Sequence, residues 1–180
     1  LEIVDQQIDE QILQDGGHFE RSPMYHSIIL EDILDLIAVS AAYGLPEVDR
    51  HVEKWSVGAS KMLGWLEALT HPDGCIAHFN DVAQHHAPSA SQLVKYAADL
   101  GISSASAGQK QGQLTELSST GFIRAKTERL DVMMNVGSVG PAYQPGHAHA
   151  DTLSFELSVD GQRWFVNTGV SGYGLSLIHI

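Results

Sequence analysis

The sequence predicts an α+β chain in two domains, with helices first and an antiparallel sheet after them. Two observations support this fold class. Apolar residues recur at helical spacing over roughly the first hundred positions, and farther along they alternate with polar residues as in a strand. The segment between them, Ser103–Gln113, is small and polar, which is typical of a linker or a long surface loop. We therefore expect a helical domain at residues 1–105 and a sheet domain at residues 106–174.

The helix boundaries are predicted from capping and helix-breaking residues. Ser22 is a suitable N-cap, and Pro23 suits the first helical position. Gly44 fits the position just past a helix end, and Pro46 opens the next helix. The predicted helices cover residues 1–13, 24–43, 46–69 and 91–100.

The sheet is predicted from shorter segments. Asp160-Gly161 provides a hairpin turn, and Phe155 and Leu157 alternate with polar residues before it. Trp164 lies on an apolar stripe in the returning arm, so we expect it in the core, with a place in a sugar subsite as the alternative. The predicted strands lie in residues 122–126 and 130–136 and in the two arms of the hairpin 152–166.

Composition excludes several classes of protein. Ten Lys and Arg against 22 Asp and Glu give a net charge of −12, which argues against a nucleic-acid binder, because such proteins need cations to neutralise phosphates. No apolar run is long enough for a membrane span. Cys75 is the one cysteine, so the chain has no internal disulfide.

A first cluster of reactive side chains surrounds the predicted start of the second helix, in the run DGGHFERSPMYH. Tyr25 falls at about the third helical position, where the positive end of the helix dipole favours a phenolate. A tyrosine in that setting can act as a general acid or base. The alternative is a purely structural role, with Tyr25 packed in a helix interface and Glu20 helping to cap the helix.

A second cluster precedes the predicted hairpin. If the segment is extended, His147, His149 and Asp151 project to one face, and two imidazoles with a carboxylate suit a divalent metal or acid–base chemistry. The alternative is a pair of surface histidines that bind nothing. The segment His78-Phe79-Asn80-Asp81 is a further candidate, either as a structural loop, which we favour, or as one wall of a cleft.

The two clusters and their order resemble the heparinase II/III-like family, which includes heparin and alginate lyases. The resemblance rests on DGGHFERSPMYH, then PDGCIAHFND, then GHAHADTLSFEL and WFVNTG, and it covers nearly the whole chain. It implies the C-terminal part of an incomplete α/α toroid followed by the start of an antiparallel β-sandwich, with the cleft between them. It also implies β-elimination at a 4-linked uronic acid of an acidic polysaccharide.

The resemblance also suggests roles for individual residues. Tyr25 matches the catalytic tyrosine by its place in the Ser-Pro-x-Tyr-His run, and His147 matches the catalytic histidine. Glu20, Arg21 and His26, which surround Tyr25 in the sequence, are the candidate substrate-binding residues. The family's Asn-His pair that clamps the uronate carboxylate has no counterpart in these 180 residues, so we expect no activity from the chain by itself.

The resemblance makes structural zinc a candidate cofactor. His149 matches one zinc ligand, but Asn167 stands where the family usually has an Asp, and an amide is a poor zinc ligand. The final residues 175–180 read as translated adapter sequence and not as native chain. From the family we expect a periplasmic or secreted protein.

Two other functions remain open. The same fold without turnover would be a glycan-binding or exopolysaccharide-handling protein, which Asn167 slightly favours. Alternatively, His147, His149 and Asp151 would activate a water on a bound metal in a hydrolase.

Overall fold

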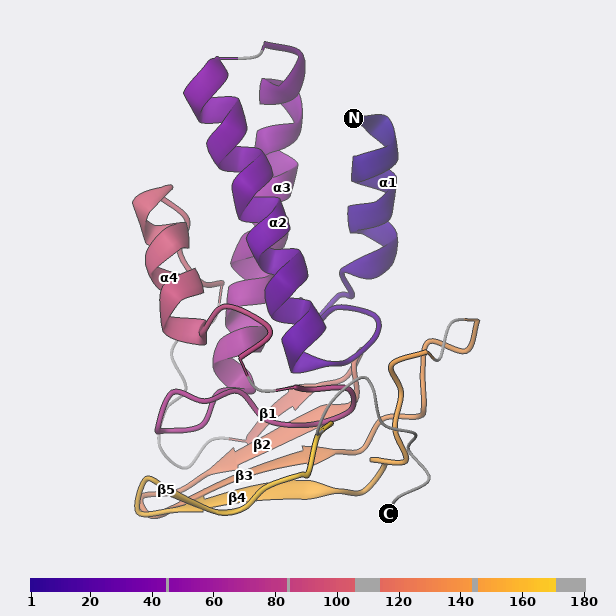
Figure 1. The fold of residues 1–180 in the computed structure, drawn as a ribbon, viewed down its shortest axis with the longest axis vertical. Coiled ribbons are helices and arrows are strands. Elements are labelled where there is room, and N and C mark those ends of the chain that lie inside the picture. Colours follow the sequence, from indigo (N-terminus) through magenta and orange to yellow (C-terminus); the bar gives the residue numbers. More distant parts are fainter. Residues whose placement is uncertain (45, 84, 106–113, 144–145, 171–180) are drawn as a thin grey trace.

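The described residues fold into four helices that stand on one face of a five-stranded sheet, as the computed structural model shows (Figure 1). This confirms the predicted α+β class. The structure describes residues 1–44, 46–83, 85–105, 114–143 and 146–170. The expected linker lies mostly outside these ranges, as do residues 175–180.

The elements are close to those expected from the sequence. The helices are α1 (Glu2–Gln11), α2 (Pro23–Tyr43), α3 (Pro46–Ala68) and α4 (Ala90–Asp99). The strands are β1 (Leu114–Leu117), β2 (Phe122–Lys126), β3 (Leu130–Asn135), β4 (Phe155–Val159) and β5 (Gln162–Phe165).

Helix α2 begins and ends as its capping residues predict. The Ser22 hydroxyl accepts a hydrogen bond from the backbone N–H of Tyr25 at 3.4 Å, and Pro23 takes the first helical position. Gly44 ends the helix in the left-handed region, with a φ of 55°. The capping places Tyr25 in the first turn of α2, next to the sheet.

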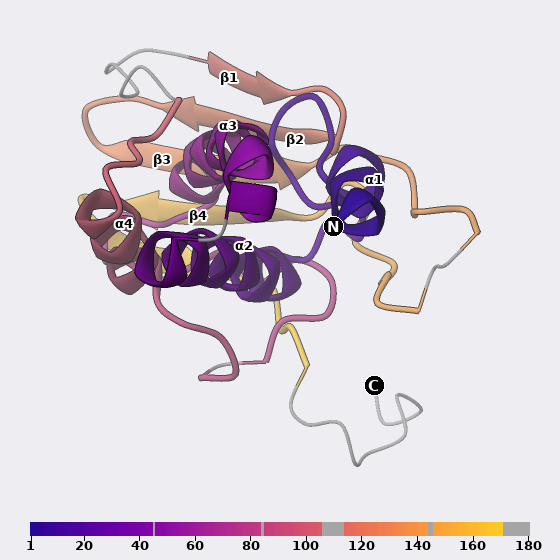
Figure 2. The ribbon, with the colours of Figure 1, turned by 90° about the horizontal axis from the view of Figure 1, so that it is seen from above.

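The helices pack on one another through an apolar core. Leu30 and Leu34 of α2, Trp55 and Leu63 of α3, and Leu93 of α4 are all almost completely buried in it. Figure 2 shows α3 above the middle of the sheet, where a second cluster joins helix and strands. That cluster comprises Trp65, Ala68, Leu69, Ala77, Phe79, Leu117, Phe122 and Met133.

The sheet is antiparallel throughout and its strands follow chain order, from β1 to β5. Strand β1 was not predicted. Its four residues, Leu114–Leu117, pair with Phe122–Ala125 of β2 across a short turn.

The sheet face that meets the helices carries buried polar residues as well as the apolar cluster. Glu156 and Ser158 of β4 point inward and are almost completely buried, whereas Phe155 is 48% exposed. Trp164 of β5 is 68% exposed, so its expected place in the core was wrong. Phe155 and Trp164 therefore contribute to an outer face that the described residues leave uncovered.

Arg124, which forms a buried ion pair within the sheet, connects the sheet to the helical layer. Arg124 of β2 binds both carboxylate oxygens of Asp131, at 2.7 and 2.5 Å, and also donates to the carbonyl oxygens of Glu67 and Ala68 at the end of α3. A cation at this helix end complements the helix dipole.

Among the residues that the structure describes, no helix is long and apolar enough to cross a membrane.

Candidate active site

The first turn of α2 and the loop that follows β3 bring Tyr25 and His147 together. Their rings stack with centroids 4.0 Å apart and planes 20° from parallel. The contact joins residues from the two clusters that the sequence singles out. It connects the first turn of α2 to the segment between β3 and β4, which Figure 1 shows as ribbons.

Glu20 orients the imidazole of His147. Its Oε2 lies 2.8 Å from Nδ1 of His147. An ionised carboxylate only accepts hydrogen bonds, so Nδ1 carries the hydrogen and the ring is fixed in position. Glu20 is buried, while the His147 side chain remains 33% exposed. This arrangement is typical of a histidine that is held for chemistry on its other nitrogen.

Asp81 approaches that other nitrogen. Its Oδ2 lies 3.9 Å from Nε2 of His147, and its backbone N–H donates to the His147 carbonyl oxygen at 3.3 Å. The Ser22 hydroxyl donates to the Asp81 carbonyl oxygen at 2.7 Å. The loop after α3 therefore forms one wall of the site, although the sequence favoured a structural role for it.

Two residues beside the site adopt the left-handed backbone conformation. Arg21 has a φ of 60° and Asn80 a φ of 59°. The Asn80 amide donates to the Arg21 carbonyl oxygen at 2.9 Å, and its oxygen accepts from the backbone N–H of His149 at 3.3 Å. Conformations of this kind cost about 1–3 kcal/mol and gather at functional sites. Asn80 thus links three segments that surround the site.

His26 has a structural position. It is completely buried, its Nδ1 accepts from the backbone N–H of His18 at 3.2 Å, and its ring packs on Trp65. Burial lowers the pKa of His26 to about 3. Burial, and secondarily the charge of His147, lower the pKa of His18 to about 4. His26 therefore cannot contact a substrate directly, contrary to the expected binding role.

Arg21 is engaged by the loop that follows β3. Its Nη1 donates to the carbonyl oxygen of Ser138 and lies 3.3 Å from the Ser138 hydroxyl. A Cβ on Gly140 would lie 3.1 Å from the guanidinium carbon, so the loop passes close to the side chain. This places Arg21 as a support for the loop that carries His147.

The segment from His147 to Asp151 is a loop and not the extended strand that the metal hypothesis assumed. Asp151 accepts a short hydrogen bond from the backbone N–H of Asn80, and the amide of Asn167 donates to the Ser154 hydroxyl at 3.4 Å. Among the described residues, no three His, Cys, Asp or Glu side chains gather as a metal site requires. Zinc binding by His149 and Asn167 stays a prediction.

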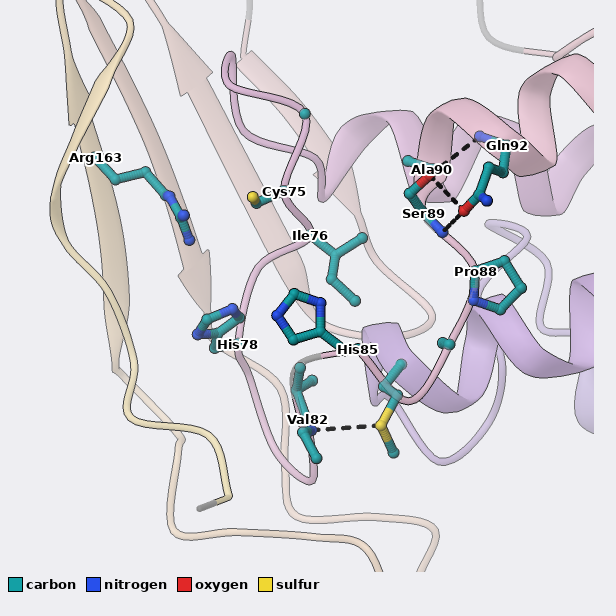
Figure 3. Close-up of a pocket in the computed structure, with 14 residues that line it drawn as sticks. Cys75, Ile76, His78, Val82, His85, Pro88, Ser89, Ala90, Gln92 and Arg163 are labelled. Carbon is teal, nitrogen blue, oxygen red and sulfur yellow. Dashed lines mark hydrogen bonds between the residues drawn. The ribbon is translucent and has the colours of Figure 1, made fainter. Parts of the chain in front are cut away.

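A cavity of about 440 Å³ lies beside the loop that carries Asp81, with His78 and Val82 of that loop in its lining (Figure 3). Met24, which precedes Tyr25 in α2, also lines it. Arg163 points toward it from β5, but its guanidinium is paired with Asp73 at 2.7 Å. The charge of Arg163 at this cavity is therefore balanced by Asp73.

Family models match almost the whole chain. The heparinase II/III N-terminus model matches residues 1–102, and the heparinase II/III-like C-terminal model matches residues 109–176. A heparin-sulfate lyase from Bacteroides stercoris is 23% identical over 94% of the chain. The chain spans 27% of that relative's length.

Solved structures have the same fold. The heparan sulfate lyase HepC from Pedobacter heparinus matches 98% of the chain at a TM-score of 0.72 and 19% identity, and the chain covers 29% of that protein. A heparinase III structure matches 94% of the chain at a TM-score of 0.66 and 17% identity, with 30% of that protein covered. The helices are therefore the C-terminal part of an incomplete α/α toroid, and the sheet begins an antiparallel β-sandwich. The chain belongs to the heparinase II/III-like family.

Proposed function

We propose that this chain supplies part of the active site of a lyase that cleaves an acidic polysaccharide at a 4-linked uronic acid by β-elimination. The observation that carries the proposal is the stacking of Tyr25 on His147 at 4.0 Å, with Glu20 holding the imidazole. The relatives named as heparin-sulfate and heparan sulfate lyases support a uronic-acid polymer as substrate.

The proposed reaction transfers one proton and needs no water. A base removes the proton from C5 of the uronate, a double bond forms between C4 and C5, and the bond from C4 to the leaving oxygen breaks. Tyr25 takes the C5 proton and returns it to the leaving oxygen. His147, aligned by Glu20, lies against the Tyr25 ring and supports the charge that develops in the transition state.

The first prediction concerns Tyr25. In a full-length protein that contains this chain, Tyr25→Phe removes the group that moves the proton, so we expect the rate to fall by about 100-fold or more. The measurement is the ultraviolet absorbance of the unsaturated product on heparan sulfate, with other uronic-acid polymers such as alginate as further substrates. We expect the wild type to generate this absorbance on at least one of them.

Tyr96→Phe is the matched control. Tyr96 lies on α4, where its hydroxyl donates to Asp35 at 2.7 Å, far along the chain from the site. We expect this variant to retain the wild-type rate. A folded wild type that releases no unsaturated product from any uronic-acid polymer would contradict the proposal, and so would full activity in Tyr25→Phe.

The same proposal gives the protein a location. A polymeric acidic glycan is met outside the cytoplasm, so we infer a periplasmic or secreted protein, as expected for bacterial lyases of this kind. Cell fractionation with an antibody to the full-length protein tests this inference.

A further inference from the structure

The carboxylate of Asp81 has one oxygen that is not hydrogen-bonded within the described residues. Its Oδ1 is buried and has no hydrogen-bond partner among the residues that the structure describes. The side chain is only 8% exposed. A buried carboxylate oxygen without a partner costs stability, and such groups are rare in folded proteins.

The backbone of Asp81 already serves the structural role. The Ser22 hydroxyl donates to its carbonyl oxygen at 2.7 Å, and its N–H donates to the His147 carbonyl oxygen at 3.3 Å. The next residue, Val82, accepts from the backbone N–H of Val170 at 2.9 Å. The loop is therefore held on both sides without the carboxylate.

The carboxylate faces the one ring nitrogen of His147 that Glu20 does not hold. Oδ2 of Asp81 and Nε2 of His147 are 3.9 Å apart, too far for a direct hydrogen bond. One oxygen atom placed between them lies within hydrogen-bond distance of both atoms, as in a bridged contact. The stacked Tyr25 ring lies beside this gap.

We propose that Asp81 and His147 together bind one hydroxyl group of the sugar, with Asp81 as a specificity-determining residue. The hydroxyl donates its hydrogen to the Asp81 carboxylate, and its oxygen accepts from Nε2 when His147 carries a hydrogen on both ring nitrogens. The inference rests on the proposed function, because it names the part of the polymer that this site recognises.

The contact discriminates between a hydroxyl and its sulfate ester. A sulfate ester has no hydrogen to donate, and its negative charge meets the carboxylates of Asp81 and Glu20 on either side of His147. In a partly buried site, a sulfate group placed beside two carboxylates is strongly repelled by them. The site therefore selects sugar units whose hydroxyl at this position is not sulfated.

The test compares two substrates in a full-length protein that contains this chain. One is an unsulfated uronic-acid polymer, and the other is the same polymer after chemical O-sulfation. Asp81→Asn keeps the size of the side chain and removes its charge. We expect kcat/KM on the unsulfated polymer to fall at least about tenfold, mainly through KM, and kcat/KM on the sulfated polymer to stay within about threefold or to rise.

Asp160→Asn is the matched control, because Asp160 pairs with Arg129 on the exposed β4–β5 turn. It should leave both values unchanged. An equal loss on both polymers in Asp81→Asn would overturn the inference while the proposed function stands. A wild type that cleaves neither polymer would overturn the proposed function and this inference with it.

If Asp81→Asn does not fold, the wild type still tests the inference. Short unsulfated substrates are methylated at one hydroxyl at a time, since a methyl ether cannot donate a hydrogen. Methylation at one position should lower kcat/KM at least about tenfold. If no single methylation changes kcat/KM by more than about threefold, the inference is wrong.

Discussion

At the scale of single residues, the position of His147 depends on contacts with residues far away in the sequence. Glu20 holds Nδ1, Tyr25 stacks on the ring, and Asp81 binds the backbone carbonyl. Each contact restricts a different freedom of the imidazole. A ring held in this way pays little reorganisation cost when charge develops beside it.

The buried histidines beside the site make the fold sensitive to acid. His26 is neutral in the folded chain because burial lowers its pKa to about 3, from an ordinary value of 6.5. The unfolded chain takes up a proton below pH 6.5, whereas the folded chain does so only near pH 3. Stability is therefore fully present above the unfolded pKa and falls as the pH decreases through this window.

We expect the pH dependence of stability to change in His26→Gln. At pH 5, keeping His26 buried and neutral lowers the free energy of unfolding by about 2 kcal/mol relative to pH 7. The variant loses packing at pH 7 but should lose about 2 kcal/mol less than the wild type between pH 7 and pH 5. Urea denaturation at the two pH values measures the difference.

His85→Gln is the matched control, because His85 is exposed. It should keep the wild-type pH dependence of the unfolding free energy. If His26→Gln showed the same slope as the wild type, burial of a neutral His26 would not be the source of acid sensitivity.

At the scale of elements, strand β4 anchors the loop that carries Asp81. Glu156 of β4 accepts from the His71 ring at 2.5 Å, from the backbone N–H of His78 at 2.7 Å and from that of Asn167 at 3.1 Å. The His71 ring also lies 2.9 Å from the Ser158 hydroxyl. One buried carboxylate thus fixes both the loop after α3 and the segment after β5.

Replacing Glu156 by Gln should loosen this anchor. Removing one partner of a buried pair costs about 3 kcal/mol, because His71 is left without its acceptor. We expect the urea midpoint of Glu156→Gln to fall accordingly while the slope of the transition is unchanged. The exposed pair of Asp160 and Arg129 provides the control, and Asp160→Asn should leave the midpoint unchanged. Equal midpoints for Glu156→Gln and the wild type would contradict the anchoring role.

At the scale of the whole molecule, the helical layer was predictable because its signals are local. Ser22, Pro23 and Gly44 set the limits of α2, and the apolar spacing identified the core faces. Strand β1 was missed because Leu114–Leu117 is too short to show a clear alternation. The sheet faces were harder, because alternation reveals that two faces exist but not which one meets the helices.

The site was only partly predictable from the sequence, because some of its residues meet only through the tertiary fold. The sequence singled out Tyr25, Glu20 and His147, and the family resemblance suggested that they act together. Asp81 lies in a loop without periodicity, and only the tertiary fold brings it to His147. His26 shows the opposite case, since this histidine follows Tyr25 in the sequence and is directed into the core.

The most direct test of the central claim is the mass of the products. Elimination adds no water, so the masses of the two fragments released from an oligosaccharide sum to the mass of the substrate. We predict this result by mass spectrometry for a full-length protein that contains this chain, and its loss in Tyr25→Phe. Fragments whose masses sum to the substrate plus one water would identify a hydrolase and contradict the account.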